Sequence, residues 1–241
     1  YTRLFKDATY WNSVINTLQL GVAIPLVQIP CSLLLAVLLN QRFKGQSLAR
    51  AVIFVPNITS TAIMAIVFYF MFASYNGIIN GVLIKMGLIE KAIEWFGNGT
   101  MAKIVIVLFC TWSGVGFYMV LFLSALQSIP SDVYESARVD GANAWQMFKF
   151  IQIPAIMLMV DFVLFDNIRG ALQVFDIPFV MTSGGPGYAS STFTLYTIET
   201  AFTYSNFGLA STMAVAIMVM IVVIYVIQNK IIHGIVLKGD K

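Results

Sequence analysis

The chain has 241 residues, of which 59% are hydrophobic and only 10% are charged, and its mean hydropathy is +0.84. Soluble domains carry about 25% charged residues, so this composition excludes that class and predicts an all-α, polytopic membrane protein with one membrane domain. The net charge of +3 is dispersed along the chain, so nucleic acid is not an expected partner. Cys31 and Cys110 lie in apolar runs without metal or disulfide spacing, and we expect both to be small core residues.

The first apolar run extends from residue 13 to residue 39, more than the roughly 20 residues that a membrane-spanning helix needs. Trp11 precedes it, where an aromatic anchor at the membrane interface is typical. Pro25 and Pro30 lie inside the run and leave backbone carbonyls that neighbouring helices or water must satisfy. We therefore expect a kinked helix that packs against other spans.

A short basic loop, residues 40–50, leads into a second apolar run at residues 51–73. This run has Pro56 near its start and hydroxyl side chains at positions 59–61, which suit close helix packing. The chain then becomes polar, and residues 81–96 mix Lys and Glu with Leu, Ile and Trp. Such an amphipathic segment predicts a helix lying in the membrane interface.

Three further spans are predicted at residues 102–126, 155–182 and 207–227. The first of these has small residues near its middle, which permit close helix approach. Five spans place the two ends of the chain on opposite sides of the membrane.

The fourth run is unusual because it contains Asp161, Asp166, Arg169 and Asp176. Charges inside spans are costly and normally face the bundle interior or a watery cavity. Asp166 and Arg169 are three residues apart on one helical face and could pair, whereas Asp161 needs a partner on a second helix. Asp176 is expected at a kink towards the outer side. We hypothesise that a solute path is lined by Trp112, Tyr118, Asp161, Asp166 and Arg169. A structural ion pair between subunits is the open alternative.

A polar stretch, residues 127–154, separates the third and fourth runs and predicts two short helices. Ser131 is a suitable N-cap, and Asp132 places a negative charge in the first turn. Gly141 follows as the left-handed residue that ends such a helix. Pro154 then fits the first turn of a new helix.

The spacing inside this stretch is specific. Glu135-Ser-Ala137 is followed after three residues by Gly141 and after nine more by Ile151-Gln-Ile-Pro154. This spacing resembles the EAA loop of binding-protein-dependent ABC importers, and residues 126–130 and 140–142 resemble its carbohydrate-importing, maltose permease-like branch. Ser136 and Ile153 depart from the family's Ala and Leu, but both changes preserve the expected packing.

In that family the loop is a cytoplasmic coupling helix seated in a cleft of the ATPase subunit. The resemblance implies that ATPase coupling falls to Tyr134, Glu135, Ser136, Ala137, Asp140, Gly141 and Ala142. It also implies a type I importer fold, with a further helix before Tyr1 and six spans in the intact protein. Residues 182–187 read as a turn and are similar to the Thr-x-Gly-Gly-Pro loop that sugar-importing permeases place near the binding protein.

The distribution of basic residues supports the same orientation. If the EAA-like loop is cytoplasmic, eight Lys or Arg lie on that side: Arg42, Lys44, Arg50, Arg138, Lys149, Lys230, Lys238 and Lys241. Five lie on the other side: Arg3, Lys6, Lys85, Lys91 and Lys103. This bias follows the positive-inside rule and agrees with a cytoplasmic EAA-like loop. The family resemblance implies a multi-pass protein of a prokaryotic cytoplasmic (inner) membrane.

No Gly in this chain is followed by Lys, so the end of a phosphate-binding P-loop is absent, and no HExxH, CxxC or GxSxG occurs. We expect no catalytic residue, metal or cofactor in this chain. The resemblance implies two separate ATP-binding subunits that hold ATP and Mg²⁺, a related but different second permease, and an extracytoplasmic solute-binding protein that delivers a sugar or oligosaccharide.

Two other function classes are alternatives to an importer permease. An ion-coupled secondary carrier or channel would use Asp161, Asp166 and Arg169 as its relay and would need no ATPase. A membrane enzyme would need a nucleophile with a base, or a metal site, and neither arrangement occurs. The sequence therefore favours one transmembrane permease domain over residues 1–241.

Overall fold

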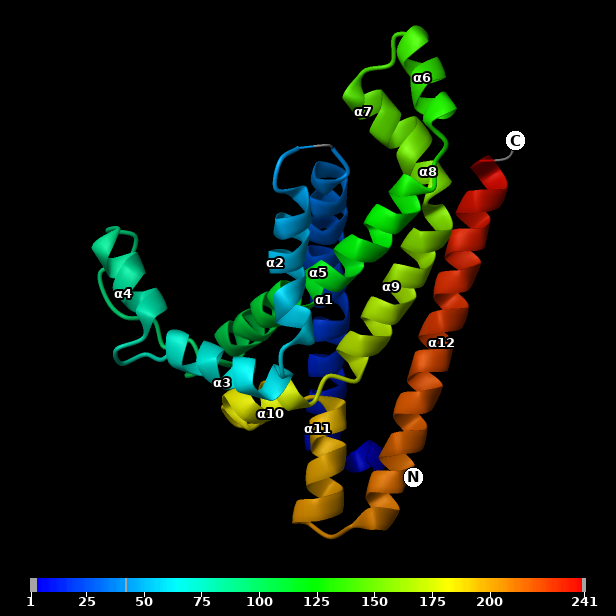
Figure 1. Ribbon diagram of the computed structural model, residues 1–241. Coiled ribbons are helices and arrows are strands. Elements are labelled where there is room, and N and C mark those ends of the chain that lie inside the picture. The colour runs from blue at the N-terminus through cyan, green and yellow to red at the C-terminus, as the bar shows by residue number, and fades with distance from the viewer. Residues whose placement is uncertain (1–3, 42, 240–241) are drawn as a thin grey trace.

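The computed structural model describes residues 4–41 and 43–239, and no strand occurs within these ranges. Three long helices are apolar enough to cross a membrane: α1 (Ala8–Leu39), α5 (Gly99–Gln127) and α12 (Phe207–Gly239) (Figure 1). They coincide with the first, third and fifth predicted spans.

Helix α1 is the centre of the bundle and packs along both α5 and α9 (Met157–Leu172) (Figure 1). It begins at Asp7, whose carboxylate accepts a hydrogen bond from the Thr9 amide at 2.8 Å. Both of its prolines lie inside the helix, as expected. Cys110 is partly buried, but Cys31 is exposed on α1, so the prediction that it belongs to the core is wrong.

The second apolar run is not one straight helix. It forms α2 (Gln46–Ile58) and α3 (Thr61–Met71), which are bent by 96° at residues 59–60. Pro56 lies in the last turn of α2, and the Thr59 hydroxyl donates to the Val55 carbonyl at 2.9 Å. Both features weaken the helix at this point, because proline lacks an amide donor and the hydroxyl competes for backbone bonds.

The predicted interfacial helix over residues 81–96 is also shorter than expected. Helix α4 covers only Ile78–Lys85, and Gly87 then adopts a left-handed φ of +71°. The buried Asn80 side chain accepts bonds from the Ile93 amide and the Trp95 indole, each at 3.1 Å. Residues 86–97 therefore fold back onto α4 instead of extending it.

The fourth apolar run divides in the same way, into α9 and a separate helix α10 (Asp176–Thr182). Pro178 lies in the first turn of α10, where its missing amide leaves no bond unmade, and Asp176 begins that turn. Asp176 thus lies at a break, as the sequence predicted, and helix α9 ends at Leu172, before the boundary expected at residue 182.

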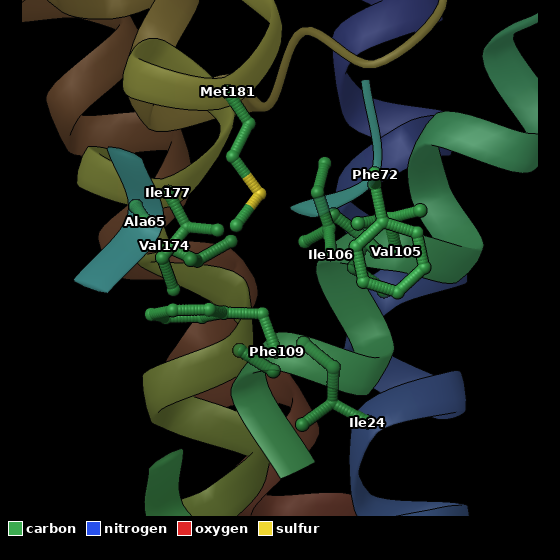
Figure 2. Packing of buried hydrophobic residues seen from close by; sticks show 11 residues of the cluster. Ile24, Ala65, Phe72, Val105, Ile106, Phe109, Val174, Ile177 and Met181 are labelled. Atoms are coloured by element: carbon green, nitrogen blue, oxygen red, sulfur yellow. The ribbon is translucent and has the colours of Figure 1, made fainter. Parts of the chain in front are cut away.

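The two broken spans meet each other. Helix α10 packs on α3, and both run across the bundle below α5 in Figure 1. A hydrophobic cluster fixes this junction to α1 and α5, and Figure 2 shows its side chains converging: Ile24, Ala65, Phe72, Val105, Ile106, Phe109, Val174, Ile177 and Met181. Burial of this cluster holds both breaks against the long helices.

The two ends of the bundle differ. The connection before α2, the polar hairpin after α5 and the C-terminal end of α12 lie together at the top of Figure 1. The short helix η1 (Leu4–Lys6), α11 (Phe193–Ile198) and the π-helix η3 (Glu199–Thr203) lie at the opposite end. This arrangement places the three predicted cytoplasmic regions on one side. Of the charges counted above, Arg3, Arg42, Lys241 and the Lys238 side chain lie outside what the structure describes.

Candidate coupling hairpin and central cavity

The polar hairpin begins with α6 (Ser131–Val139), which ends in a complete Schellman motif. Gly141 adopts a φ of +79°, its amide donates to the Arg138 carbonyl at 3.1 Å, and the Ala142 amide donates to the Ala137 carbonyl at 2.9 Å. The left-handed turn predicted at Gly141 is confirmed. The N-cap is Pro130 and not Ser131, because the chain is already helical at Ser131 and its hydroxyl makes no capping bond.

The second arm of the hairpin also carries a capping motif. It runs through α7 (Ala144–Met147), the π-helix η2 (Phe148–Gln152) and α8 (Ile153–Ala155). Asn143 and Gln146 form a capping box. The backbone amide of Gln146 donates to the Asn143 side-chain oxygen at 2.9 Å, and the backbone amide of Asn143 donates to the Gln146 side-chain oxygen at 2.8 Å. This arm is then bent by 71° from α9. Caps on both sides of Gly141 give the turn a defined shape.

The hairpin projects beyond the helices of the bundle (Figure 1), and most of the predicted coupling residues are accessible on it. Glu135, Ser136, Asp140 and Gly141 are exposed, and Tyr134 and Ala142 are half-buried. Ala137 is buried inside the hairpin, where it packs instead of facing outward.

Sequence reasoning missed the apolar part of this surface. Val139 is 88% exposed, Trp145 67% and Phe150 66%, on a segment whose other exposed residues are mostly polar. Exposed apolar groups rimmed by polar ones are typical of surfaces that contact another protein. The feature of the sequence that indicated this apolar surface was Trp145, a tryptophan in the middle of a polar loop.

A second candidate site is a cavity of about 320 Å³ near the two helix breaks. Its walls come from α1, α2, α3, α5, α9 and α10. The polar side chains that line it are Gln28, Asn57, Thr61, Ser113, Tyr118, Asn167, Gln173 and Asp176. Amides and hydroxyls dominate this lining, so the cavity is suited to a solute that donates and accepts many hydrogen bonds.

A chain of amide groups crosses one wall of the cavity. Gln28 is 4% exposed, donates to the Cys110 carbonyl at 2.9 Å and accepts from the Asn167 amide at 2.8 Å. Asn167 is 2% exposed, and its Oδ1 accepts no hydrogen bond from the described residues. A buried acceptor without a donor is costly, so the position of Asn167 lowers the stability of the bundle.

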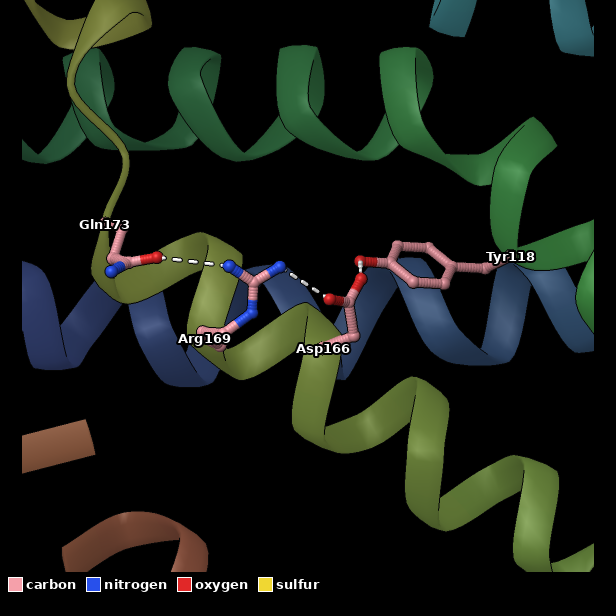
Figure 3. Close-up of polar contacts among 4 residues, drawn as sticks. All are labelled: Tyr118, Asp166, Arg169 and Gln173. Carbon is pink, nitrogen blue, oxygen red and sulfur yellow. Dashed lines mark hydrogen bonds and ion pairs between the residues drawn. The ribbon is translucent and has the colours of Figure 1, made fainter. Parts of the chain in front are cut away.

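The predicted pair between Asp166 and Arg169 is confirmed, with a distance of 2.6 Å between Oδ1 and Nη2. Tyr118 donates to the other oxygen of Asp166 at 3.2 Å, and Arg169 donates to the Gln173 side chain at 3.3 Å (Figure 3). Tyr118 and Gln173 line the cavity, but the two charged residues do not. The structure therefore places the ion pair beside the cavity.

The other two predicted path residues lie elsewhere. Asp161 accepts a hydrogen bond from Gln228 of α12 at 2.8 Å, so its partner on a second helix is an amide. Trp112 packs on Phe68, with 5.1 Å between ring centroids, and is not part of the cavity lining. The residues that sequence reasoning missed, chiefly Gln28, Asn57 and Asn167, were visible only as amides inside apolar runs.

The turn at residues 182–187 is also present, with Ser183, Gly184 and Gly187 at positive φ. It lies at the same end of the molecule as Tyr196, whose hydroxyl donates to Asp7. Burial, followed by that hydrogen bond and the negative charge of Asp7, raises the pKa of Tyr196. In the part of the chain that the structure describes, no group of His, Cys, Asp and Glu is arranged to hold a metal ion.

We expect Gln28→Met to lower the free energy of unfolding by about 3 kcal/mol, because it removes one donor and one acceptor from buried partners. Thermal unfolding in detergent measures the change. Gln127→Met, the same substitution at an exposed position on α5, is the matched control and should leave the midpoint unchanged. Equal midpoints for the two variants would show that the amide chain does not stabilise the bundle.

Comparison with known proteins assigns the chain to a family. Residues 28–235 match the family described as the binding-protein-dependent transport system inner membrane component. The chain is 33% identical over 230 residues to the lactose transport system permease protein of Rhizobium radiobacter, covering 94% of this chain and 77% of that protein.

The chain is also 30% identical over 234 residues to the trehalose/maltose transport system permease protein of Thermococcus litoralis, covering 96% of this chain and 77% of that protein. Its fold is that of a chain in a bacterial ABC transporter involved in the import of the acidic polysaccharide alginate, with a TM-score of 0.88, 23% identity, and coverage of 97% and 82%. The chain therefore belongs to the family of binding-protein-dependent transport system inner membrane components, which are multi-pass transport permeases.

Proposed function

We propose that this chain is the permease subunit of an ATP-driven importer that takes a sugar or oligosaccharide from an extracytoplasmic binding protein. The observation that carries the proposal is the capped hairpin, which has the spacing of the family's EAA loop and projects from the bundle with Glu135 exposed. Relatives named for lactose and for trehalose/maltose transport support the sugar class. The amides and hydroxyls that line the cavity are consistent with it.

In the proposed mechanism, two partner ATPase subunits bind ATP and Mg²⁺ and close, and the hairpin transmits that motion to the spans. Transmission needs a rigid connection, which the Schellman turn at Gly141 and the capping box at Asn143 provide. The hairpin would face the cytoplasm together with the end of α12, in agreement with the distribution of basic residues. A second permease subunit, related to this chain, would complete the path.

For the solute, we propose contacts from the cavity lining and not from the ion pair. Asn57 and Ser113 offer donors and acceptors there, whereas Asp166 and Arg169 satisfy each other at 2.6 Å. The pair then has a structural role: it neutralises two charges inside a span and holds Tyr118 and Gln173 at the cavity wall.

The function is tested by reconstituting this chain with its ATPases, partner permease and binding protein in proteoliposomes. We expect uptake of radiolabelled lactose, maltose or trehalose to require ATP inside and binding protein outside. Uptake that continues without ATP and stops when an ion gradient is dissipated would contradict the proposal and favour a secondary carrier that uses Asp161, Asp166 and Arg169.

Two variants distinguish the role proposed for the cavity lining, which is solute binding, from the structural role proposed for the ion pair. Asn57→Leu should raise the solute concentration for half-maximal uptake about tenfold, because it removes one polar contact at an accessible position. Arg169→Met should leave that concentration and the order of solute preference unchanged, although it lowers the amount of folded protein by leaving Asp166 unpaired. A changed order of solute preference in Arg169→Met would show that Arg169 belongs to the solute path.

A further inference from the structure

The charge of the cavity limits the class of ligand that the cavity can bind. Among the described residues that line it, Asp176 is the single acidic residue, and no lysine or arginine is present. Asp176 is half-buried at the start of α10, and no cationic group lies within salt-bridge distance of it in the described chain. Its negative charge therefore faces the cavity without a cationic partner.

The cationic side chains near the cavity do not make its net charge positive. The Arg169 guanidinium is bound by Asp166 at 2.6 Å and by Gln173 at 3.3 Å, so its charge is already matched by a carboxylate. The Lys103 ammonium donates to Asn16 and Gln19 at 3.1 and 2.6 Å and borders a different groove, between α1 and α5. The net charge of the cavity and the ion pair beside it is negative.

We infer that the cavity admits uncharged or cationic solutes and excludes anionic ones, with Asp176 as the residue that determines this specificity. The inference rests on the proposed function and adds a limit on the class of sugar: neutral sugars fit, whereas uronic acids and sugar phosphates are repelled. A carboxylate accepts hydrogen bonds from sugar hydroxyls but opposes a second negative charge strongly where water is scarce. The alginate importer shares the fold, but a fold does not fix the substrate.

A cysteine that the chain already contains can report which reagents enter the cavity. The chain has two cysteines, of which Cys110 lines the cavity and Cys31 is exposed on α1 outside it. In a Cys31→Ser background, the assembled importer in lipid nanodiscs is reacted with cationic, neutral and anionic methanethiosulfonates of similar size. Each rate is divided by the rate of the same reagent with a free thiol, which removes intrinsic differences in reactivity.

We expect the cationic reagent to label Cys110 about tenfold faster than the anionic one, as one unpaired charge in a partly desolvated site requires. Asp176→Asn should bring the ratio close to one. Glu90→Gln removes an equal charge from an exposed position outside the cavity and should leave the ratio unchanged.

Two results would overturn the inference. Equal labelling by cationic and anionic reagents would show that Asp176 does not set the potential of the cavity, while ATP-dependent sugar uptake would still stand. Failure of every reagent, including the neutral one, to label either Cys110 or a Ser113→Cys variant, with and without ATP, would show that polar molecules do not enter the cavity, and would remove the solute site proposed there as well.

Discussion

Replacing Trp145 with aspartate should lower ATP-driven uptake about 100-fold while leaving the protein folded in the membrane. The indole is 67% exposed on α7, so its loss removes little packing within the chain. Large aromatic side chains at the centre of a protein interface commonly contribute about 2–4 kcal/mol to binding, and a buried aspartate in their place adds a desolvation penalty. Co-purification of the ATPase subunits and ATP-dependent uptake measure the two consequences together.

The matched control is Phe43→Asp, which introduces the same charge at an exposed aromatic residue at the same end of the molecule, in the connection before α2. It should leave uptake and ATPase co-purification unchanged. Normal uptake by Trp145→Asp would show that this face of the hairpin does not touch the ATPase. Loss of the folded chain would show that the indole supports the hairpin itself.

Gly116→Ala should destabilise the bundle by about 3 kcal/mol or more and sharply reduce the amount of folded protein. An added Cβ at this position would lie 2.3 Å from the Ile53 carbonyl oxygen and 2.9 Å from the Phe54 Cα. Both atoms belong to the backbone of α2, so no side chain can rotate away and the two helices must separate. Yield after detergent extraction and the midpoint of thermal unfolding report the effect.

Gly208→Ala is the control for this substitution, because a Cβ at Gly208 would meet nothing within 4 Å and the residue lies in helix α12. It should be neutral or slightly stabilising, since alanine is the better helix former. Similar thermal midpoints for the two alanine variants would mean that α2 and α5 do not approach as closely as the structure shows.

Much of this architecture was predictable because it depends on local properties. A long apolar run already fixes a spanning helix, and three runs became α1, α5 and α12. The left-handed turn at Gly141 and the pair between Asp166 and Arg169 follow from spacings of a few residues. The coupling role of the hairpin remains a prediction, but its shape was determined by the sequence around it.

Only tertiary structure decided that the two broken runs pack on each other and which polar residues face the cavity. Asn167 meets Gln28 across 139 positions of sequence, so no periodicity or spacing along the chain could pair them. Likewise, Ala137 belongs to the coupling motif but is buried by its own hairpin, while Trp145 outside the motif is exposed. Hydropathy selects which segments enter the membrane because transfer from water depends on each segment alone. The direction in which a polar side chain points depends on the helices packed around it, and that packing exists only in the folded chain.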